Sequence, residues 1–142
     1  MKAVIVYAST TGNTEQMAQA IAEGVKAAGA EALLGRAENA SEADALAADV
    51  LLLGSPAMGA EVLDDPMEAF FSSIENSLSG KKVGLFGSYD WGDGQWMRDW
   101  EERVKAAGAQ LLNGTGLTVH LTPESADKES CTAFGTKAVR DK

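Results

Sequence analysis

The segment from residue 9 to residue 14 groups residue types that bind an anion. It reads Ser-Thr-Thr-Gly-Asn-Thr, follows an apolar run at 3–7, and opens a helical pattern. Where a parallel strand passes into a helix, free backbone N–H groups and the positive end of the helix dipole attract phosphate. We therefore interpret the segment as a phosphate-binding loop made of Ser9, Thr10, Thr11, Gly12, Asn13 and Thr14. An ordinary helix N-terminus, capped by Asn13 or Thr11, is the alternative.

This first segment contains neither Lys nor Arg. A phosphate bound there would be held by hydroxyls, the Asn13 amide and backbone N–H groups, all of which are neutral donors. The sequence therefore excludes the lysine-bearing loop of nucleoside triphosphatases.

A second candidate segment follows the short apolar run at 50–53, and it consists of Ser55, Pro56, Ala57, Met58, Gly59, Ala60 and Glu61. Met58 has no helical stripe to join, and its polarizable thioether suits the face of a flat aromatic ligand, although it could instead fold back onto the core. Gly59 permits a positive φ, so the peptide after it could adopt more than one orientation. Glu61 could accept a hydrogen bond from a ring N–H, or it could be solvated.

A third segment, rich in aromatics and glycine, begins with Ser88, Tyr89, Asp90, Trp91 and Gly92. Trp91 stands among residues that cannot form a core, so it either packs on a ligand or is badly exposed. Trp96 is different because it begins a helical pattern, and we interpret it as structural.

The three segments offer no nucleophile with a matching base. Cys131 lies inside a helical pattern and is expected in the core, and His120 lies in a predicted strand without an evident triad partner. Binding without residue-based catalysis points to a cofactor that does its own chemistry.

Alternating strand and helix patterns must position these segments. We expect strands at 3–8, 31–36, 50–53, 83–87 and 110–121, the last interrupted at 113–116, with helices between and after them. This order predicts an α/β fold with a doubly wound, five-stranded parallel sheet and helices on both faces, as one domain over residues 1–142. In the sheet order 2-1-3-4-5, the three candidate segments follow strands 1, 3 and 4 and form one crevice.

Composition narrows the choice of partners. The 142 residues carry 12 basic and 21 acidic side chains, for a net charge of −9. Such a chain should repel nucleic acid and be steered toward basic protein surfaces, unless the charge serves solubility alone. A single cysteine and a single histidine argue against a disulfide and against a metal site built from either residue. Without a signal peptide or a membrane span, we expect a cytoplasmic monomer that does not insert into membranes.

Taken in order, the three segments resemble those of the flavodoxins, which carry non-covalent FMN. The first closely matches the family's phosphate-loop pattern, Ser/Thr-x-Thr-Gly-Asn-Thr. The stretch Gly-Ser-Tyr-Asp-Trp-Gly-Asp-Gly-Gln-Trp-Met at 87–97 is similar to the ring-binding loop of short-chain clostridial members. The resemblance covers essentially the whole chain.

The resemblance implies that residues 9–14 bind the FMN phosphate and that the isoalloxazine lies between Met58 and Trp91. It places Glu61 near the pyrimidine edge, Ser88 at the ribityl chain, and backbone groups of 89–92 at the ring edge. It also implies a low-potential one-electron carrier, not an enzyme, which shuttles between semiquinone and hydroquinone and passes electrons between redox proteins.

Three residues depart from the short-chain pattern. Pro56 stands where relatives often have Ser, Ala60 replaces a polar residue or glycine, and Asp90 stands where glycine is usual. Other activities fit less well. An FMN-dependent NAD(P)H:quinone or flavin reductase would need a site for a second substrate, and this short acidic chain has no evident basic site for a nicotinamide phosphate.

Two modules of the same topology that bind no flavin also fit poorly. A receiver domain would need acidic residues where Ser9 and Ser55 follow their strands. A low-molecular-weight phosphatase would need a cysteine in the first segment, which has none.

Overall fold

Strands and helices alternate along the chain in the computed structural model, which describes residues 1–9, 12–59, 62–90 and 92–140. The elements are β1 (Lys2–Tyr7), α1 (Asn13–Ala27), β2 (Glu31–Arg36), η1 (Ala37–Asn39), α2 (Glu42–Ala47), β3 (Val50–Gly54), β4 (Ala57–Met58), β5 (Val62–Leu63), α3 (Asp65–Ile74), η2 (Glu75–Ser77), β6 (Lys82–Tyr89), α4 (Gln95–Ala106), β7 (Gln110–Leu111), η3 (Leu112–Gly114), β8 (Leu117–His120) and α5 (Ser125–Arg140).

The main sheet is parallel throughout and has the order β2-β1-β3-β6-β7, with β8 also paired to β6. The expected order 2-1-3-4-5 is therefore confirmed, and β7 and β8 together take the place of the fifth strand. The break between them lies at η3, where Asn113 and Gly114 have φ values of 63° and 70°.

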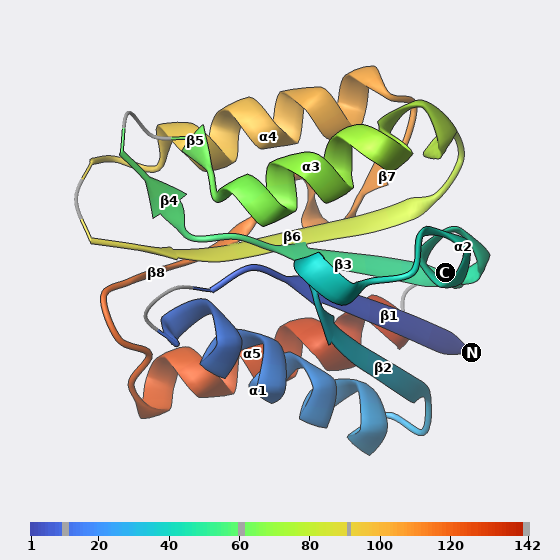
Figure 1. Ribbon diagram of the computed structural model, residues 1–142. Coiled ribbons are helices and arrows are strands. Elements are labelled where there is room, and N and C mark those ends of the chain that lie inside the picture. The colour runs from blue at the N-terminus through green and yellow to red at the C-terminus, as the bar shows by residue number, and fades with distance from the viewer. Residues whose placement is uncertain (10–11, 60–61, 91, 141–142) are drawn as a thin grey trace.

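Helices cover both faces of this sheet (Figure 1). Helices α1 and α5 pack on one face, whereas α3 and α4 pack on the other. Side chains of β1 alternate between the two cores, with Ile5 on the α1–α5 side and Val4 on the α3–α4 side. Strand β3 is buried along its whole length, as its continuous apolar run predicts for a central parallel strand.

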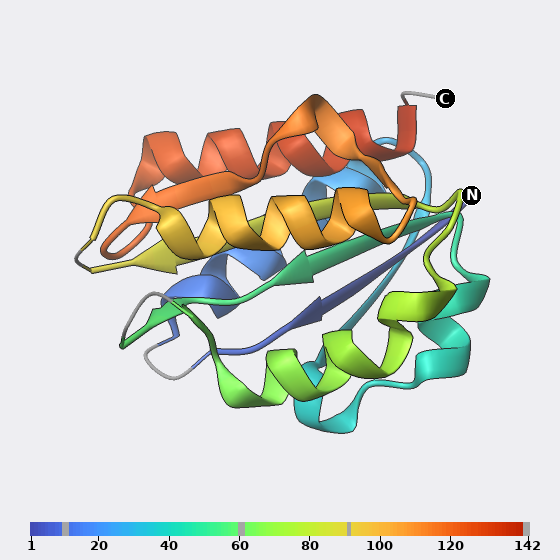
Figure 2. The same ribbon diagram turned by 90° about the horizontal axis from the view of Figure 1, so that it is seen from above.

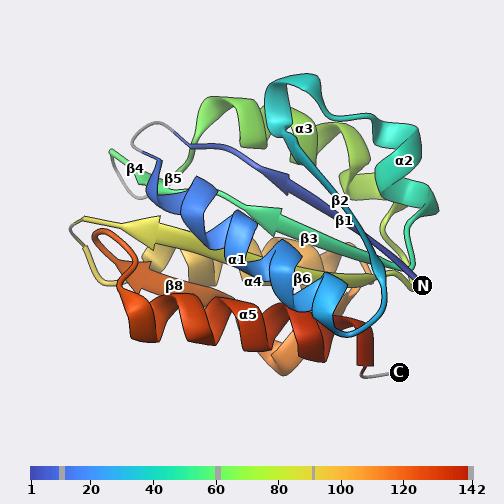
Figure 3. The same ribbon diagram turned by 90° about the horizontal axis from the view of Figure 1, so that it is seen from below.

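The carboxyl ends of β1, β3 and β6 point to the same edge of the sheet (Figures 2 and 3). Hydrogen bonds join the chain just beyond these ends. The Ala8 N–H donates to the Gly54 carbonyl at 2.9 Å, and the Ser55 N–H donates to the Phe86 carbonyl at 3.1 Å. The three candidate segments therefore leave the sheet side by side.

Two details differ from the sequence prediction. The two glycines and the proline of residues 54–65 predict a loop, whereas β4 and β5 pair within this stretch as a small antiparallel hairpin. Strands of two residues are too short to leave a periodic pattern. The dipeptide Asp65-Pro66 predicts a helix with Asp65 as the N-cap residue and Pro66 at the first position. In the structure, α3 begins one position earlier, at Asp65, with Asp64 as its N-cap residue. Proline tolerates either position because the first N–H groups of a helix have no intrahelical acceptor.

Candidate functional site

The first segment turns sharply from β1 into α1. Gly12 is the N-cap residue of α1 and has a φ of 91°, which glycine adopts without the penalty of a Cβ. The Ser9 hydroxyl accepts hydrogen bonds from the backbone N–H groups of Gly12, at 3.0 Å, and Glu15, at 3.4 Å. Gly12 itself has no side chain to cap the helix, and among the described residues only the Ser9 hydroxyl bonds to the first turn, through Glu15. Backbone N–H groups at Asn13 and Thr14 therefore remain for an anion.

A buried contact joins the first and third segments. The hydroxyls of Thr14 and Ser88 lie 2.8 Å apart and share a hydrogen bond, although 74 residues separate them in the sequence. Both residues are almost fully buried, with exposed fractions of 1% and 3%. The sequence assigned both to one ligand site, and the structure brings them together.

Ser55, at the start of the second segment, is fully buried and uses its polar groups inside the protein. Its hydroxyl donates to the Pro56 carbonyl and accepts from the Asp64 N–H, each at 3.0 Å. Its carbonyl accepts from the Trp96 indole N–H at 3.2 Å. A Cβ on Gly87 would come within 2.1 Å of that carbonyl, so only glycine permits this approach. Ser55 thus fixes the second segment against the third.

The rest of the second segment lies nearer the surface. Pro56 is buried, Ala57 and Met58 are half-buried, and Gly59 is exposed. The β4–β5 hairpin pairs Met58 with Val62 and so places the thioether on a defined element. Gly59 has no left-handed φ here, and a Cβ built on it meets no atom within 4 Å.

The third segment is anchored by Tyr89. Its ring packs on Trp96 and His120, with centroid distances of 5.5 and 4.9 Å. The His120 Nε2 lies 2.9 Å from the Asp90 carbonyl. Asp90 and Gly92 are exposed, and Gly92 has a φ of 88°.

Three residues that we interpreted as structural or left unassigned now have places in the fold. Trp96 is buried in the α3–α4 core, as expected. Cys131 is buried in the opposite core, where burial raises the pKa of its thiol to about 12 and leaves it a poor nucleophile. His120 holds the backbone of the third segment and stacks on Tyr89.

Five predicted site residues lie outside the described residues, namely Thr10, Thr11, Ala60, Glu61 and Trp91. Their proposed roles therefore rest on sequence alone. The described members of the same three segments leave the sheet at one edge. The bond between the Thr14 and Ser88 hydroxyls connects the first segment to the third there.

A cation that the sequence pattern does not reveal lies beside the first segment. Arg36, the last residue of β2, donates from Nη2 to the Ser9 carbonyl at 2.7 Å. It also lies 3.5 Å from a Glu15 carboxylate oxygen and stacks over the Tyr7 ring. The strand order contained the signal, because β2 lies in parallel beside β1 and places Arg36 opposite Tyr7.

Tyr7 belongs to the same network. Its hydroxyl donates to the Glu15 carboxylate at 2.8 Å. Burial raises the pKa of Tyr7, and the hydrogen bond to Glu15 raises it further. Tyr7 therefore stays protonated and continues to donate throughout the physiological pH range.

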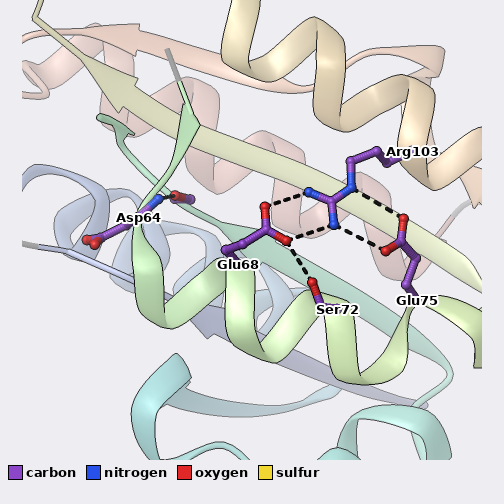
Figure 4. A network of polar contacts seen from close by, with 6 residues as sticks. Asp64, Glu68, Ser72, Glu75 and Arg103 are labelled. Carbon is purple, nitrogen blue, oxygen red and sulfur yellow. Dashed lines mark hydrogen bonds and ion pairs between the residues drawn. The ribbon is translucent and has the colours of Figure 1, made fainter. Parts of the chain in front are cut away.

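An ion-pair network holds α3 against α4 (Figure 4). The Arg103 guanidinium donates to both Glu68 oxygens, at 2.7 and 2.8 Å, and to both Glu75 oxygens, at 3.1 and 3.3 Å. Hydrogen bonds from Arg103 lower the pKa of Glu68. At the start of α3, burial raises the pKa of Asp64. The network fixes the helix that follows the second segment.

The described residues fit the phosphate end of the expected FMN. Backbone N–H groups at the start of α1, after a left-handed glycine, and nearby hydroxyls are donors that phosphate binds in this fold class. Among the residues described, no group of three or more His, Cys, Asp or Glu side chains could hold a metal ion.

Comparisons with known proteins agree with this arrangement. Residues 5–135 match the family model for flavodoxin. The chain is 47% identical to the flavodoxin of Megasphaera elsdenii over 137 residues, covering 96% of this chain and 97% of the relative. It is 45% identical to the flavodoxin of Clostridium beijerinckii over 134 residues, covering 94% and 96%. The solution structure of two-electron reduced M. elsdenii flavodoxin superposes with a TM-score of 0.87, at 45% identity, over 97% of this chain and 98% of that one.

Proposed function

This chain belongs to the flavodoxin family, and from that premise we propose that its segments 9–14, 55–61 and 88–92 form the binding site for FMN. The chain is a low-potential one-electron carrier that uses FMN, rather than an enzyme. The observation that carries the site proposal is the 2.8 Å contact between the Thr14 and Ser88 hydroxyls. It holds the expected phosphate loop beside the expected ribityl-binding segment.

At the phosphate end, the backbone N–H groups at the start of α1 would bind the phosphate, together with the hydroxyls of Thr10 and Thr11. The absence of a capping side chain on Gly12 supports this role, because the helix dipole and the N–H groups of Asn13 and Thr14 favour an anion. Ser9 shapes the turn, since its hydroxyl accepts hydrogen bonds from the backbone N–H groups of Gly12, within the segment, and of Glu15, just after it.

At the ring end, Met58 would pack against one face of the isoalloxazine and Trp91 against the other. Thioethers and indoles both suit the face of a flat aromatic system. Glu61 would accept a hydrogen bond from the pyrimidine edge, and backbone groups of 89–92 would contact the ring. The packing of Tyr89 between Trp96 and His120 supports this role, because these contacts and the hydrogen bond from His120 hold the backbone at Tyr89 and Asp90.

When bound, FMN supplies the one-electron chemistry, and the chain sets the potential through the charges around the ring. Acidic side chains are frequent near the three segments and include Asp64, Asp65, Asp90 and Asp93. They oppose the gain of negative charge by Coulomb repulsion, which is strongest where stacked side chains exclude water. This local negative charge supports a strongly negative potential for the second one-electron reduction of the flavin.

The partners of this chain are redox proteins, and we propose that they dock through basic surfaces. The net charge of −9 supports this proposal, because an acidic surface steers basic partners during encounter. Within the described residues, no helix is both long and apolar enough to cross a membrane. We propose further that the 142 residues act as one FMN-binding unit, as a monomer in the cytoplasm.

Removing the Thr14 hydroxyl tests the site. Thr14→Val keeps the shape of the side chain and leaves Ser88 without its partner, so the dissociation constant for FMN should rise about 10-fold. Thr136→Val is the matched control, since it removes a hydrogen bond of 2.9 Å to the Gly24 carbonyl, on α1 but outside the three segments. Quenching of FMN fluorescence on binding measures the dissociation constants of both variants. Wild-type affinity in Thr14→Val would refute the proposed site.

A further inference from the structure

Arg36 connects the two ends of the first segment from a neighbouring strand. Its Nη2 donates to the Ser9 carbonyl at 2.7 Å, and its Nη1 lies 3.5 Å from a Glu15 carboxylate oxygen. Ser9 precedes the segment's turn and Glu15 lies in the first turn of α1. A single guanidinium therefore bridges the entry and the exit of the turn.

Neighbouring contacts hold the guanidinium in this position. It stacks over the Tyr7 ring at 5.5 Å from the centroid, and its Nε donates to Glu38 at 3.4 Å. The Tyr7 hydroxyl in turn orients the Glu15 carboxylate. Planar stacking combined with a fork of donors is a geometry that Arg provides and Lys does not.

The same contacts place opposite charges beside the turn. Glu15 brings a carboxylate to the end of α1 where the segment's anion would bind, and that carboxylate repels a phosphate. Arg36 offsets this repulsion, because its positive charge lies against Glu15 and against the segment's own backbone. The side chains of both residues are only partly exposed, at 38% and 36%, so water screens the pair incompletely.

We propose that Arg36 is a positioning residue for the phosphate of the flavin: it ties Ser9, at the start of the first segment, to Glu15, just after its end, and offsets the charge of Glu15. This inference rests on the proposed function, because it assigns the phosphate to that segment. The proposed role predicts an effect on phosphorylated flavins alone. Loss of Arg36 should weaken binding of a phosphorylated flavin and leave binding of the same ring without phosphate nearly unchanged.

The experiment compares FMN with riboflavin on the full chain freed of flavin. For Arg36→Met, which keeps an apolar stem against Tyr7, the FMN dissociation constant should rise about 10-fold and that of riboflavin by less than about 2-fold. Arg36→Lys keeps the charge without the fork and should lose less than Arg36→Met. Arg98→Met is the matched control, since Arg98 pairs with Asp93 beside the third segment, and its ratio of FMN to riboflavin affinity should equal that of the wild type.

A double variant separates positioning from support of the fold. If Arg36 offsets Glu15, then adding Glu15→Gln to Arg36→Met should restore part of the lost FMN affinity. A purely structural Arg36 predicts further loss, because the Tyr7 contact is also weakened. An equal loss of both flavins in Arg36→Met, or no loss of either, would overturn the inference. If the wild type bound FMN no better than riboflavin, the proposed phosphate loop would fail, and this role of Arg36 would fail with it.

Discussion

Gly59→Ala tests whether the backbone after Met58 changes conformation during the first one-electron reduction. In the structure described, Gly59 has no left-handed φ, and a Cβ added there meets no atom within 4 Å. Alanine therefore introduces no clash and no strain in this conformation. We expect reduction to turn the Gly59 carbonyl toward N5 of the flavin through a positive φ, which glycine adopts freely.

The size of the effect follows from backbone energetics. A residue with a Cβ is destabilised by about 1–2 kcal/mol in the left-handed region. For a one-electron couple, 1 kcal/mol corresponds to about 43 mV, so the first reduction potential should fall by about 40–90 mV. The second potential should change less, because both of its states share the turned conformation.

Anaerobic potentiometric titration followed by visible absorbance measures both steps. Gly35→Ala is the matched control, because Gly35 also has open space around its Cβ and no left-handed φ, but lies on β2 outside the three segments. The control should keep both potentials. An unchanged first potential in Gly59→Ala would refute the conformational change.

The remaining predictions concern stability, charge and docking. Arg103→Met should lower the free energy of unfolding by about 2 kcal/mol at pH 7, less than for a fully buried pair because Glu68 is partly exposed. Since Arg103 lowers the pKa of Glu68, the stability it confers is present at neutral pH and fades as Glu68 is protonated, so urea unfolding at pH 4 should show a smaller loss. Burial raises the pKa of Asp64, so the protonated carboxyl stabilises the native state at low pH, and this stabilisation fades as the pH rises. Asparagine does not titrate, so the stability of Asp64→Asn relative to the wild type should increase from pH 3.5 to pH 7. Thermal melts of both proteins at the two pH values would measure this change. Asp90→Asn should raise the second reduction potential, and an unchanged value in the same titration would mean that this exposed carboxylate points away from the ring. Electron-transfer rates with a basic partner should fall as salt rises, in stopped-flow measurements between about 0.05 and 0.5 M.

The sheet was predictable because its signals are local and repeated. The apolar run at 50–53 predicts a buried parallel strand, and the strand–helix alternation predicts right-handed crossovers. The hairpin of β4 and β5 was not predictable, since each of its strands has only two residues.

The proposed site can be inferred from the sequence where a segment carries its own donors, and less so where distant residues supply contacts. The hydroxyl-rich segment at 9–14 is recognisable in isolation. Arg36 is not, because its contact with Ser9 spans 27 positions and depends on the pairing of β2 with β1. The hydrogen bonds that the Ser55 hydroxyl and carbonyl make within the protein were not predictable either. Such satisfaction of hydrogen bonds depends on packing, which the sequence pattern does not reveal.

The visible spectrum during stepwise anaerobic reduction with dithionite tests the central claim most directly. A low-potential one-electron carrier should show bound flavin that passes through a blue one-electron-reduced form and bleaches only at low potential. NADPH alone should leave the spectrum unchanged. Direct two-electron bleaching, or bleaching by NADPH, would contradict the account in favour of a reductase. A colourless protein that cannot be reconstituted with FMN would contradict the flavin site itself.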